Sequence, residues 1–397
     1  MEAGFYTEHA VIVFSDAAAG REDTSGQMLQ ELLFCPVAAW IVQALKKLGI
    51  KHFFALCKAE EEAQVKACFT DPASVTCGND RAALDAFLER EKPQWLLGVT
   101  KPVLITAAAA IQLRSDRPWP EENANGGIFR VAGEALKAAL HNGGSLLGAM
   151  ETASGVAYEK ADGTLLRPVS TPWELYQAQA AGRLEVAHRH MENGVLFLDL
   201  DTVYIDPRVK IGAGTMILPG TILKGKTVIG NQCEIGPNTM ISNCTVGDHT
   251  VVNASQCNDS VIGARTKVGP FAYMRPNCRI GDDVKVGDFV EVKNSILGNG
   301  TKVSHLTYVG DSDVGAHVNL GCGTVTVNYD GAVKARTVVK DGAFVGCNAN
   351  LVAPVTVGEG AYVAAGSTIT EDVPPGSLAI ARDRQTNKPE WKRKTKK

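Results

Sequence analysis

From about Ile211 onward, an aliphatic residue followed by Gly recurs at intervals of roughly six residues or multiples of six, the spacing of hexapeptide repeats. The pairs include Ile229-Gly230, Ile235-Gly236, Ile262-Gly263, Val268-Gly269, Ile280-Gly281, Val286-Gly287, Val314-Gly315, Leu320-Gly321, Val345-Gly346 and Val357-Gly358. This period predicts a parallel β-helix, in which three short strands and three turns make one coil. The aliphatic side chain should point inward, and Gly suits a corner that needs positive φ or close backbone approach. Any functional site is therefore expected on the outside of a rod.

Length, charge and cysteine use restrict the remaining possibilities. A chain of 397 residues suggests two or three domains. A formal net charge of -3 argues against a general nucleic-acid binder. The ten cysteines show no CxxC, the first residues do not resemble a signal peptide, and no apolar run reaches the ~18 residues of a membrane span. We expect a cytoplasmic protein with reduced thiols and no membrane partner.

Residues 8–195 alternate between apolar runs and helical patterns. The expected strands are residues 10–14 (AVIVF), 52–57 (HFFALC) and 102–106 (PVLIT), and the expected helices are residues 28–48, 60–69, 132–140 and 173–191. Such alternation predicts a doubly wound, mostly parallel α/β sheet. The expected order is an α/β domain at 1–172, a connector helix within 173–200, a β-helix at 201–386 and a basic tail at 387–397.

One stretch of the predicted β-helix contains more charged and titratable residues than a purely structural repeat requires. Because one coil takes about 18 residues and neighbouring strands lie about 4.8 Å apart, Arg275 and Lys293 should stack on one face. Two aligned cations suit an anion such as a sugar phosphate. His305 lies two-thirds of a coil further on, so it should occupy another face and meet Lys293 only through a groove between subunits or a bending loop. His305 plus 18 falls at Gly323, beside a break in the period at residues 328–336.

The same stretch closely resembles the C-terminal domain of the bifunctional N-acetylglucosamine-1-phosphate uridylyltransferase/glucosamine-1-phosphate N-acetyltransferase family. The resemblance covers about residues 191–391 and rests on HLTYVGD, GCGTVTVNYDG, VGCNANLVAPVTVG, VAAGS and RQTNKPEW. It implies a left-handed parallel β-helix, a homotrimer, acetyl-CoA as co-substrate and a role in UDP-N-acetylglucosamine and cell-wall precursor synthesis. The rod's flat faces and the split between Lys293 and His305 favour the same trimer.

The resemblance also assigns roles to individual residues. It implies that His305 is the general base that deprotonates the 2-amino group of glucosamine 1-phosphate, with Glu291 beside the amine. The sugar phosphate would be held by Arg275, Lys293, Tyr308, Asn319 and Lys334. Acetyl-CoA would contact Cys322, Asn328, Tyr329, Cys347, Ala365 and Arg382. An ammonium cannot attack a thioester, so a base that works near neutrality is needed, and donors such as the Asn328 side chain or backbone N–H groups suit the developing oxyanion.

The N-terminal half lacks the motifs that this family uses for nucleotidyl transfer. The Gly-rich phosphate loop expected after the first strand is replaced by residues 15–23 (SDAAAGRED). Residues 106–110 (TAAAA) hold no metal-binding Asp after the PVLIT strand, and residues 167–170 (RPVS) replace the second metal site. The domain also appears about thirty residues short of the family's. We therefore expect neither Mg²⁺ binding nor uridylyl transfer.

Three other functions are compatible with parts of the sequence. A zinc carbonic anhydrase on this fold needs three converging imidazoles, and His305 and His317 lack a third at the required spacing. A non-catalytic regulatory or scaffolding paralogue would not need the site residues. An acetyltransferase acting on another amino-sugar phosphate is compatible with all of them.

Overall fold

The computed structural model describes residues 7–16, 23–114, 125–142, 144–163 and 165–392. The chain divides into two compact units, Met1–His188 and Arg189–Lys397. In the part of the chain so described, no helix has the length and apolarity needed to cross a membrane.

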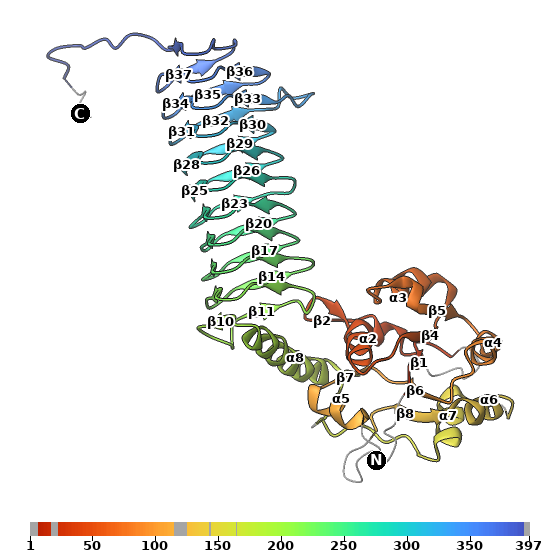
Figure 1. Ribbon diagram of the computed structural model, residues 1–397. Helices are drawn as coiled ribbons and strands as arrows, with labels where there is room; N and C mark the ends of the chain where they lie inside the picture. The colour runs from red at the N-terminus through yellow and green to blue at the C-terminus, as the bar shows by residue number, and fades with distance from the viewer. Residues whose placement is uncertain (1–6, 17–22, 115–124, 143, 164, 393–397) are drawn as a thin grey trace, which may run out of the picture. The chain divides into compact units, whose positions relative to one another are not determined.

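The first unit is an α/β domain (Figure 1). Its elements are β1 (His9–Val13), α1 (Ser25–Met28), β2 (Glu31–Leu32), β3 (Cys35–Pro36), α2 (Val37–Lys47), β4 (His52–Leu56), α3 (Glu62–Ala67), β5 (Val75–Gly78), α4 (Arg81–Glu91), β6 (Trp95–Val99), β7 (Val103–Ile105), α5 (Ala107–Arg114), β8 (Ile128–Ala132), α6 (Gly133–Leu140), α7 (Leu146–Ser154), β9 (Leu166–Pro168) and α8 (Pro172–Glu192). The main sheet has the order β5-β4-β1-β6-β8, and only β8 is antiparallel. The predicted doubly wound, mostly parallel sheet is confirmed.

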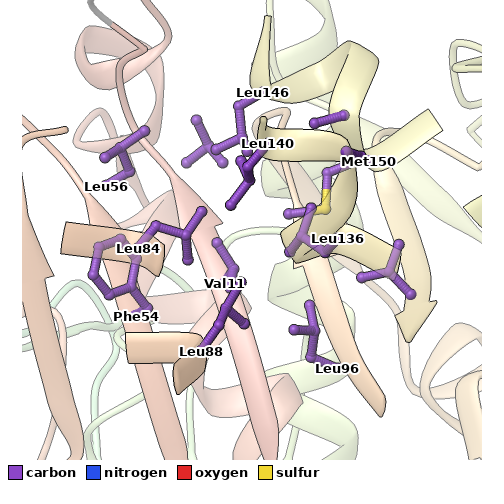
Figure 2. Packing of buried hydrophobic residues seen from close by; sticks show 14 of the residues in the cluster. Val11, Phe54, Leu56, Leu84, Leu88, Leu96, Leu136, Leu140, Leu146 and Met150 are labelled. Atoms are coloured by element: carbon purple, nitrogen blue, oxygen red, sulfur yellow. The ribbon is translucent and has the colours of Figure 1, made fainter. Parts of the chain in front are cut away.

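One face of this sheet packs against α4, α6 and α7. Figure 2 shows Val11, Phe54 and Leu96 from three strands meeting Leu84 of α4 and Met150 of α7. Such side chains each contribute about 1.5–3 kcal/mol when fully buried. At the start of α4 the Asp80 carboxylate accepts a hydrogen bond from the Ala83 N–H at 2.8 Å. This bond caps the helix that covers the sheet.

Two predicted elements of this domain were wrong in detail. The expected helix at 28–48 is only α2, because Leu33 and Phe34 take positive φ in the turn of the β2–β3 hairpin and Pro36 precedes the helix. The PVLIT segment forms β7, which pairs with β9 and lies outside the five-stranded sheet. The strand that pairs with β1 on the side away from β4 is β6, whose apolar run WLLGV is interrupted by a glycine.

The second unit is a parallel β-helix built from three sheets (Figure 1). The β10 sheet contains β10 (Leu196–Phe197), β13 (Met216–Ile217), β16 (Glu234–Ile235), β19 (Val251–Val252), β22 (Lys267–Val268), β25 (Lys285–Asp288), β28 (Lys302–His305), β31 (Asn319–Leu320), β34 (Phe344–Val345), β37 (Tyr362–Val363) and β39 (Leu378–Ala379). The β11 sheet contains β11 (Tyr204–Ile205), β14 (Ile222–Lys224), β17 (Met240–Ser242), β20 (Gln256–Asn258), β23 (Tyr273–Met274), β26 (Glu291–Lys293), β29 (Tyr308–Gly310), β32 (Val325–Val327), β35 (Asn350–Val352) and β38 (Thr368–Ile369). The β12 sheet contains β12 (Lys210–Ile211), β15 (Val228–Ile229), β18 (Thr245–Val246), β21 (Val261–Ile262), β24 (Arg279–Ile280), β27 (Ile296–Leu297), β30 (Ser312–Val314), β33 (Thr337–Val339) and β36 (Val355–Val357). The hexapeptide prediction is confirmed.

The corner glycines serve close packing between coils. A Cβ on Gly263 would lie 2.4 Å from the Gly281 carbonyl carbon, and one on Gly247 would lie 2.6 Å from the Ala264 nitrogen. Neither glycine takes positive φ. Buried hydroxyls join the coils, as where Thr301 Oγ1 donates to the Gly315 carbonyl at 2.7 Å. At these two repeats the glycine is therefore required by space, whereas Gly236 and Gly269 of other repeats also take positive φ.

Candidate functional site

His305 ends β28 and lies on a ridge at the corner that follows the strands of the β10 sheet. Asp288 pairs directly with His305 in the coil before. Extending the strand register of β28, β31, β34 and β37 by two residues places one further residue per coil on the same line. We call this line the His305 ridge: Asp288, His305, Cys322, Cys347 and Ala365.

The expected interval of 18 residues was one too long here. Asp288 to His305 and His305 to Cys322 are each 17 positions apart, because the coils at this level lack one residue. Cys322, rather than Gly323, therefore occupies the coil that follows His305. The next coil is longer, since Asn319 pairs with Phe344. The extra residues form the loop at 328–336, which projects from the stack beside β33 (Figure 1).

The predicted acetyl-CoA residues follow the ridge beyond His305. Cys322 is half-buried and Cys347 is exposed, whereas the described cysteines earlier in the β-helix are buried. Arg382 Nε donates a hydrogen bond to the Ala365 carbonyl at 2.8 Å and remains exposed. Asn319 lies on the outer face of the β10 sheet, three residues before Cys322. The half-buried Cys322 and the exposed Cys347 thus lie on the side of His305 that faces away from Asp288.

The predicted sugar-phosphate residues gather on the β11 sheet, the next face of the rod. Arg275 follows β23, and the register of β23 with β26 places it beside Lys293 in the following coil. The Lys293 and Lys334 side chains contact each other, and this contact lowers the pKa of Lys293, helped by burial and opposed by Asp311. We call Arg275, Lys293 and Lys334 the cation patch. The predicted stacking of Arg275 on Lys293 is confirmed.

Two carboxylates accompany the cation patch. Glu291 accepts a hydrogen bond from Arg275 Nη1 at 2.9 Å, so Arg275 is partly neutralised. Asp311, only 6% exposed, accepts from Asn294 Nδ2 at 2.5 Å and from Asn328 Nδ2. Burial raises the pKa of Asp311, but these hydrogen bonds and the nearby lysines hold it below the usual range.

In the coil that follows Lys293, a glycine and a tyrosine lie beside it. Lys293 pairs with Gly310, and Tyr308 pairs with Glu291. The Tyr308 ring lies over Gly310, because a Cβ on that glycine would be 2.3 Å from Tyr308 Oη. The position that follows Lys293 in the next coil is therefore covered by the Tyr308 ring.

The loop at 328–336 brings Lys334 to the cation patch. Arg336 anchors its end, with Nε 3.0 Å from Asp313 Oδ2 in β30. Tyr329, which is 53% exposed, donates its hydroxyl hydrogen to the Gly331 carbonyl at 2.5 Å. One of the two side-chain amide N–H groups of Asn328 donates a hydrogen bond to Asp311. The other N–H group is therefore the one left to stabilise an oxyanion.

Sequence reasoning missed Asp288 and Asp311, although both were within reach of it. Asp311 ends the HLTYVGD motif. Asp288 lies one coil before His305, and a corrected coil length of 17 would have found it. Their hydrogen bonds, however, come from side chains that only the folded coil brings together.

The site residues form two groups within one chain. The His305 ridge belongs to the β10 sheet and the cation patch to the β11 sheet, as the position of His305 two-thirds of a coil beyond Lys293 predicted. His317 lies in the corner that precedes β31, at the opposite end of the β10-sheet strands from the His305 ridge.

At the carboxyl edge of the N-terminal sheet, charges pair with one another. Asp16, 6% exposed, follows β1, contacts Arg81 Nη2 at 3.0 Å and accepts from the Leu146 N–H at 2.7 Å. Asp23 binds Lys58 Nζ at 2.5 Å, which lowers the pKa of Asp23 to about 2. Residues 17–22 of the loop discussed above lie outside the described residues. A doubly wound sheet binds ligands at this edge, and here a buried carboxylate occupies the end of the first strand.

Known proteins resemble the second unit strongly. The family model "Bacterial transferase hexapeptide (six repeats)" matches residues 259–294 and 336–371. The chain is 55% identical over 214 residues to bifunctional protein GlmU of Geobacillus sp. (strain WCH70), covering 54% of this chain and 47% of that protein. It is 52% identical over 239 residues to bifunctional protein GlmU of Brevibacillus brevis, covering 60% and 52%. The family resemblance of the β-helix is confirmed.

The chain spans about half the length of these relatives. Among solved structures, an Arabidopsis UDP-N-acetylglucosamine acyltransferase aligns at 16% identity over 48% of this chain and 66% of that one, with a TM-score of 0.28. That similarity is too distant to add to the argument.

Proposed function

We propose that the β-helix half transfers the acetyl group of acetyl-CoA to the 2-amino group of glucosamine 1-phosphate, giving N-acetylglucosamine 1-phosphate for UDP-N-acetylglucosamine synthesis in the cytoplasm. The observation that carries the proposal is the position of His305 on its ridge. Asp288 lies in the coil before it, and Cys322 and Cys347 lie in the two coils after it. The motif identity with bifunctional GlmU proteins over this segment supports it.

In this reaction His305 accepts a proton from the amine, whose lone pair attacks the thioester carbonyl carbon. The C–N bond forms, the C–S bond breaks, and the CoA thiolate leaves. A positioned base of this kind contributes about 10²–10⁴-fold to the rate. Acetyl-CoA would extend along the His305 ridge past Cys322, Cys347 and Ala365 toward Arg382, with Asn328 and Tyr329 beside it.

The cation patch would hold the phosphate of the sugar. Lys293 and Lys334 are held close together, an arrangement that a phosphate dianion stabilises by charge-assisted hydrogen bonds. Tyr308 and Asn319 would flank the sugar, and Glu291 would lie near the amine. Because the cation patch and the His305 ridge lie on different faces, we propose a homotrimer in which one protomer's patch faces another's ridge.

The N-terminal domain is proposed to lack uridylyltransferase activity. β6, which pairs with β1, ends at Val99 and is followed by Thr100 and Lys101, neither of which offers a carboxylate to Mg²⁺. The Asp16 carboxylate, which follows β1, already pairs with Arg81, so this arginine is not offered to a nucleotide phosphate. A regulatory or scaffolding role for the N-terminal domain is compatible with this loss.

The test is CoA release from acetyl-CoA with glucosamine 1-phosphate and with a panel of other amino-sugar phosphates. A further arm measures pyrophosphate release from UTP, N-acetylglucosamine 1-phosphate and Mg²⁺. The proposal expects acetylation with glucosamine 1-phosphate as the best acceptor and no pyrophosphate. A better acceptor in the panel would reassign the substrate, and no CoA release with any acceptor would favour the scaffolding function.

A further inference from the structure

Two strands of the β10 sheet are longer than their neighbours at the level of His305. β25 and β28 each have four residues, whereas β22 and β31 on either side have two. The extension carries the pairing on to Asp288 and His305. Gly287 makes it possible, because a Cβ at that position would lie 1.9 Å from the Ser304 carbonyl oxygen.

The two side chains are in direct contact. His305 Nδ1 lies 2.5 Å from Asp288 Oδ1, and the side chains are 52% and 38% exposed. This contact lowers the pKa of Asp288, with a smaller contribution from Lys285 on the same strand. The other titratable side chains nearby along these coils are Lys302, on the strand of His305, and Cys322 in the next coil.

We propose that Asp288 is the positioning residue of the proposed acetyl transfer. Its carboxylate accepts the Nδ1–H of the neutral His305 ring, which leaves the Nε2 lone pair for the amine proton. When Nε2 takes that proton, the carboxylate stabilises the resulting imidazolium. The proton then passes from Nε2 to the departing CoA thiolate, so the ring returns to its starting form. The assignment rests on the proposed function, but the tautomer of His305 can be measured without it.

The kinetic test compares Asp288→Asn and Asp288→Ala with wild type. The loss in kcat should be about 10–100-fold for Asn, which retains an acceptor oxygen, and larger for Ala, within the ~10²–10⁴-fold that a general base contributes. KM for glucosamine 1-phosphate should stay within about twofold, because Asp288 contacts the His305 ring and is proposed to bind no part of the sugar phosphate.

The matched control is Asp283→Asn, which removes a carboxylate in the same coil that binds Arg265 Nε at 2.8 Å. It should leave kcat unchanged. Wild-type kcat in Asp288→Asn, or an equal loss in Asp283→Asn, would overturn the assignment.

A second readout is independent of turnover. Long-range ¹H–¹⁵N spectra of the full chain, with the His305 signals identified by their absence in His305→Gln, report which ring nitrogen carries the proton. We expect the Nδ1–H form in the wild type and a loss of that preference in Asp288→Ala, which removes the acceptor. An Nε2–H ring in the wild type, or the same tautomer preference in Asp288→Ala, would contradict the proposal. If the spectra agree but no acceptor is acetylated, the proposed function fails and the Asp288–His305 contact stands.

Discussion

Lys293 illustrates how a single residue sets a measurable property of the site. Its pKa is lowered because the Lys334 side chain contacts it, with burial adding to the effect. It therefore loses its proton at a lower pH than an ordinary lysine, whose pKa is about 10.4. The positive charge offered to a phosphate is present below that lowered pKa and disappears as the pH rises through it.

The resulting prediction concerns KM for the sugar phosphate at alkaline pH. In wild type, KM should begin to rise below the ordinary lysine range. In Lys334→Met the rise should move to higher pH, because the neighbouring cation is gone, while KM at neutral pH increases by about 10–100-fold through the loss of a charged hydrogen bond. Lys267→Met, two coils before β28, is the control. Unshifted alkaline behaviour in Lys334→Met would show that the two lysines do not interact.

Asp311 provides a residue-scale prediction about stability. Its folded-state pKa lies below the unfolded value of about 3.9, so its contribution is present above that value and is lost as the pH falls through the folded pKa. Asp311→Asn should therefore destabilise the β-helix at pH 7 by about 1–3 kcal/mol, and the difference from wild type should vanish at acid pH. Denaturant unfolding at several pH values measures it. A difference that does not depend on pH would contradict the account.

At the scale of elements, the extended β25–β28 pair depends on Gly287. Gly287→Ala places a Cβ against the Ser304 carbonyl, so the two strands must separate. Overpacking of this kind costs about 1–3 kcal/mol and would move Asp288 from His305. The prediction is a lowered melting temperature together with reduced kcat. Gly26→Ala, where the added Cβ meets nothing within 4 Å, should change neither.

The sequence predicted the elements that depend on periodicity. The stacked coils, the His305 and Lys293 faces and the Arg275–Lys293 stacking follow from a repeat that each strand obeys. The exact partner of His305 did not follow, because a coil of 17 residues replaces one of 18 and no local signal marks the difference. The prediction of one helix over residues 28–48 was wrong for a similar reason, because apolar spacing does not reveal the turn at Leu33 and Phe34.

At the scale of the whole molecule, the solenoid buries its own core coil by coil. His190, 5% exposed, lies in the second unit, which begins at Arg189. A fragment of residues 189–397 should therefore fold, sediment as a homotrimer and keep the acetylation rate of the full chain. A folded, fully active monomer would defeat the trimer. A folded trimer without acetylation would show that the α/β domain contributes to catalysis.

The central claim is that His305 is the base of an acetyl transfer carried out by the β-helix. The most direct measurement is the rate of CoA release from acetyl-CoA and glucosamine 1-phosphate by the full chain and by His305→Ala, with sedimentation of both. The account predicts a rate about 10²–10⁴-fold lower in the variant, with unchanged assembly, because the side chain is half exposed and adds little to the core. Equal rates in the two proteins would show that His305 is a surface residue of the rod and would contradict the account.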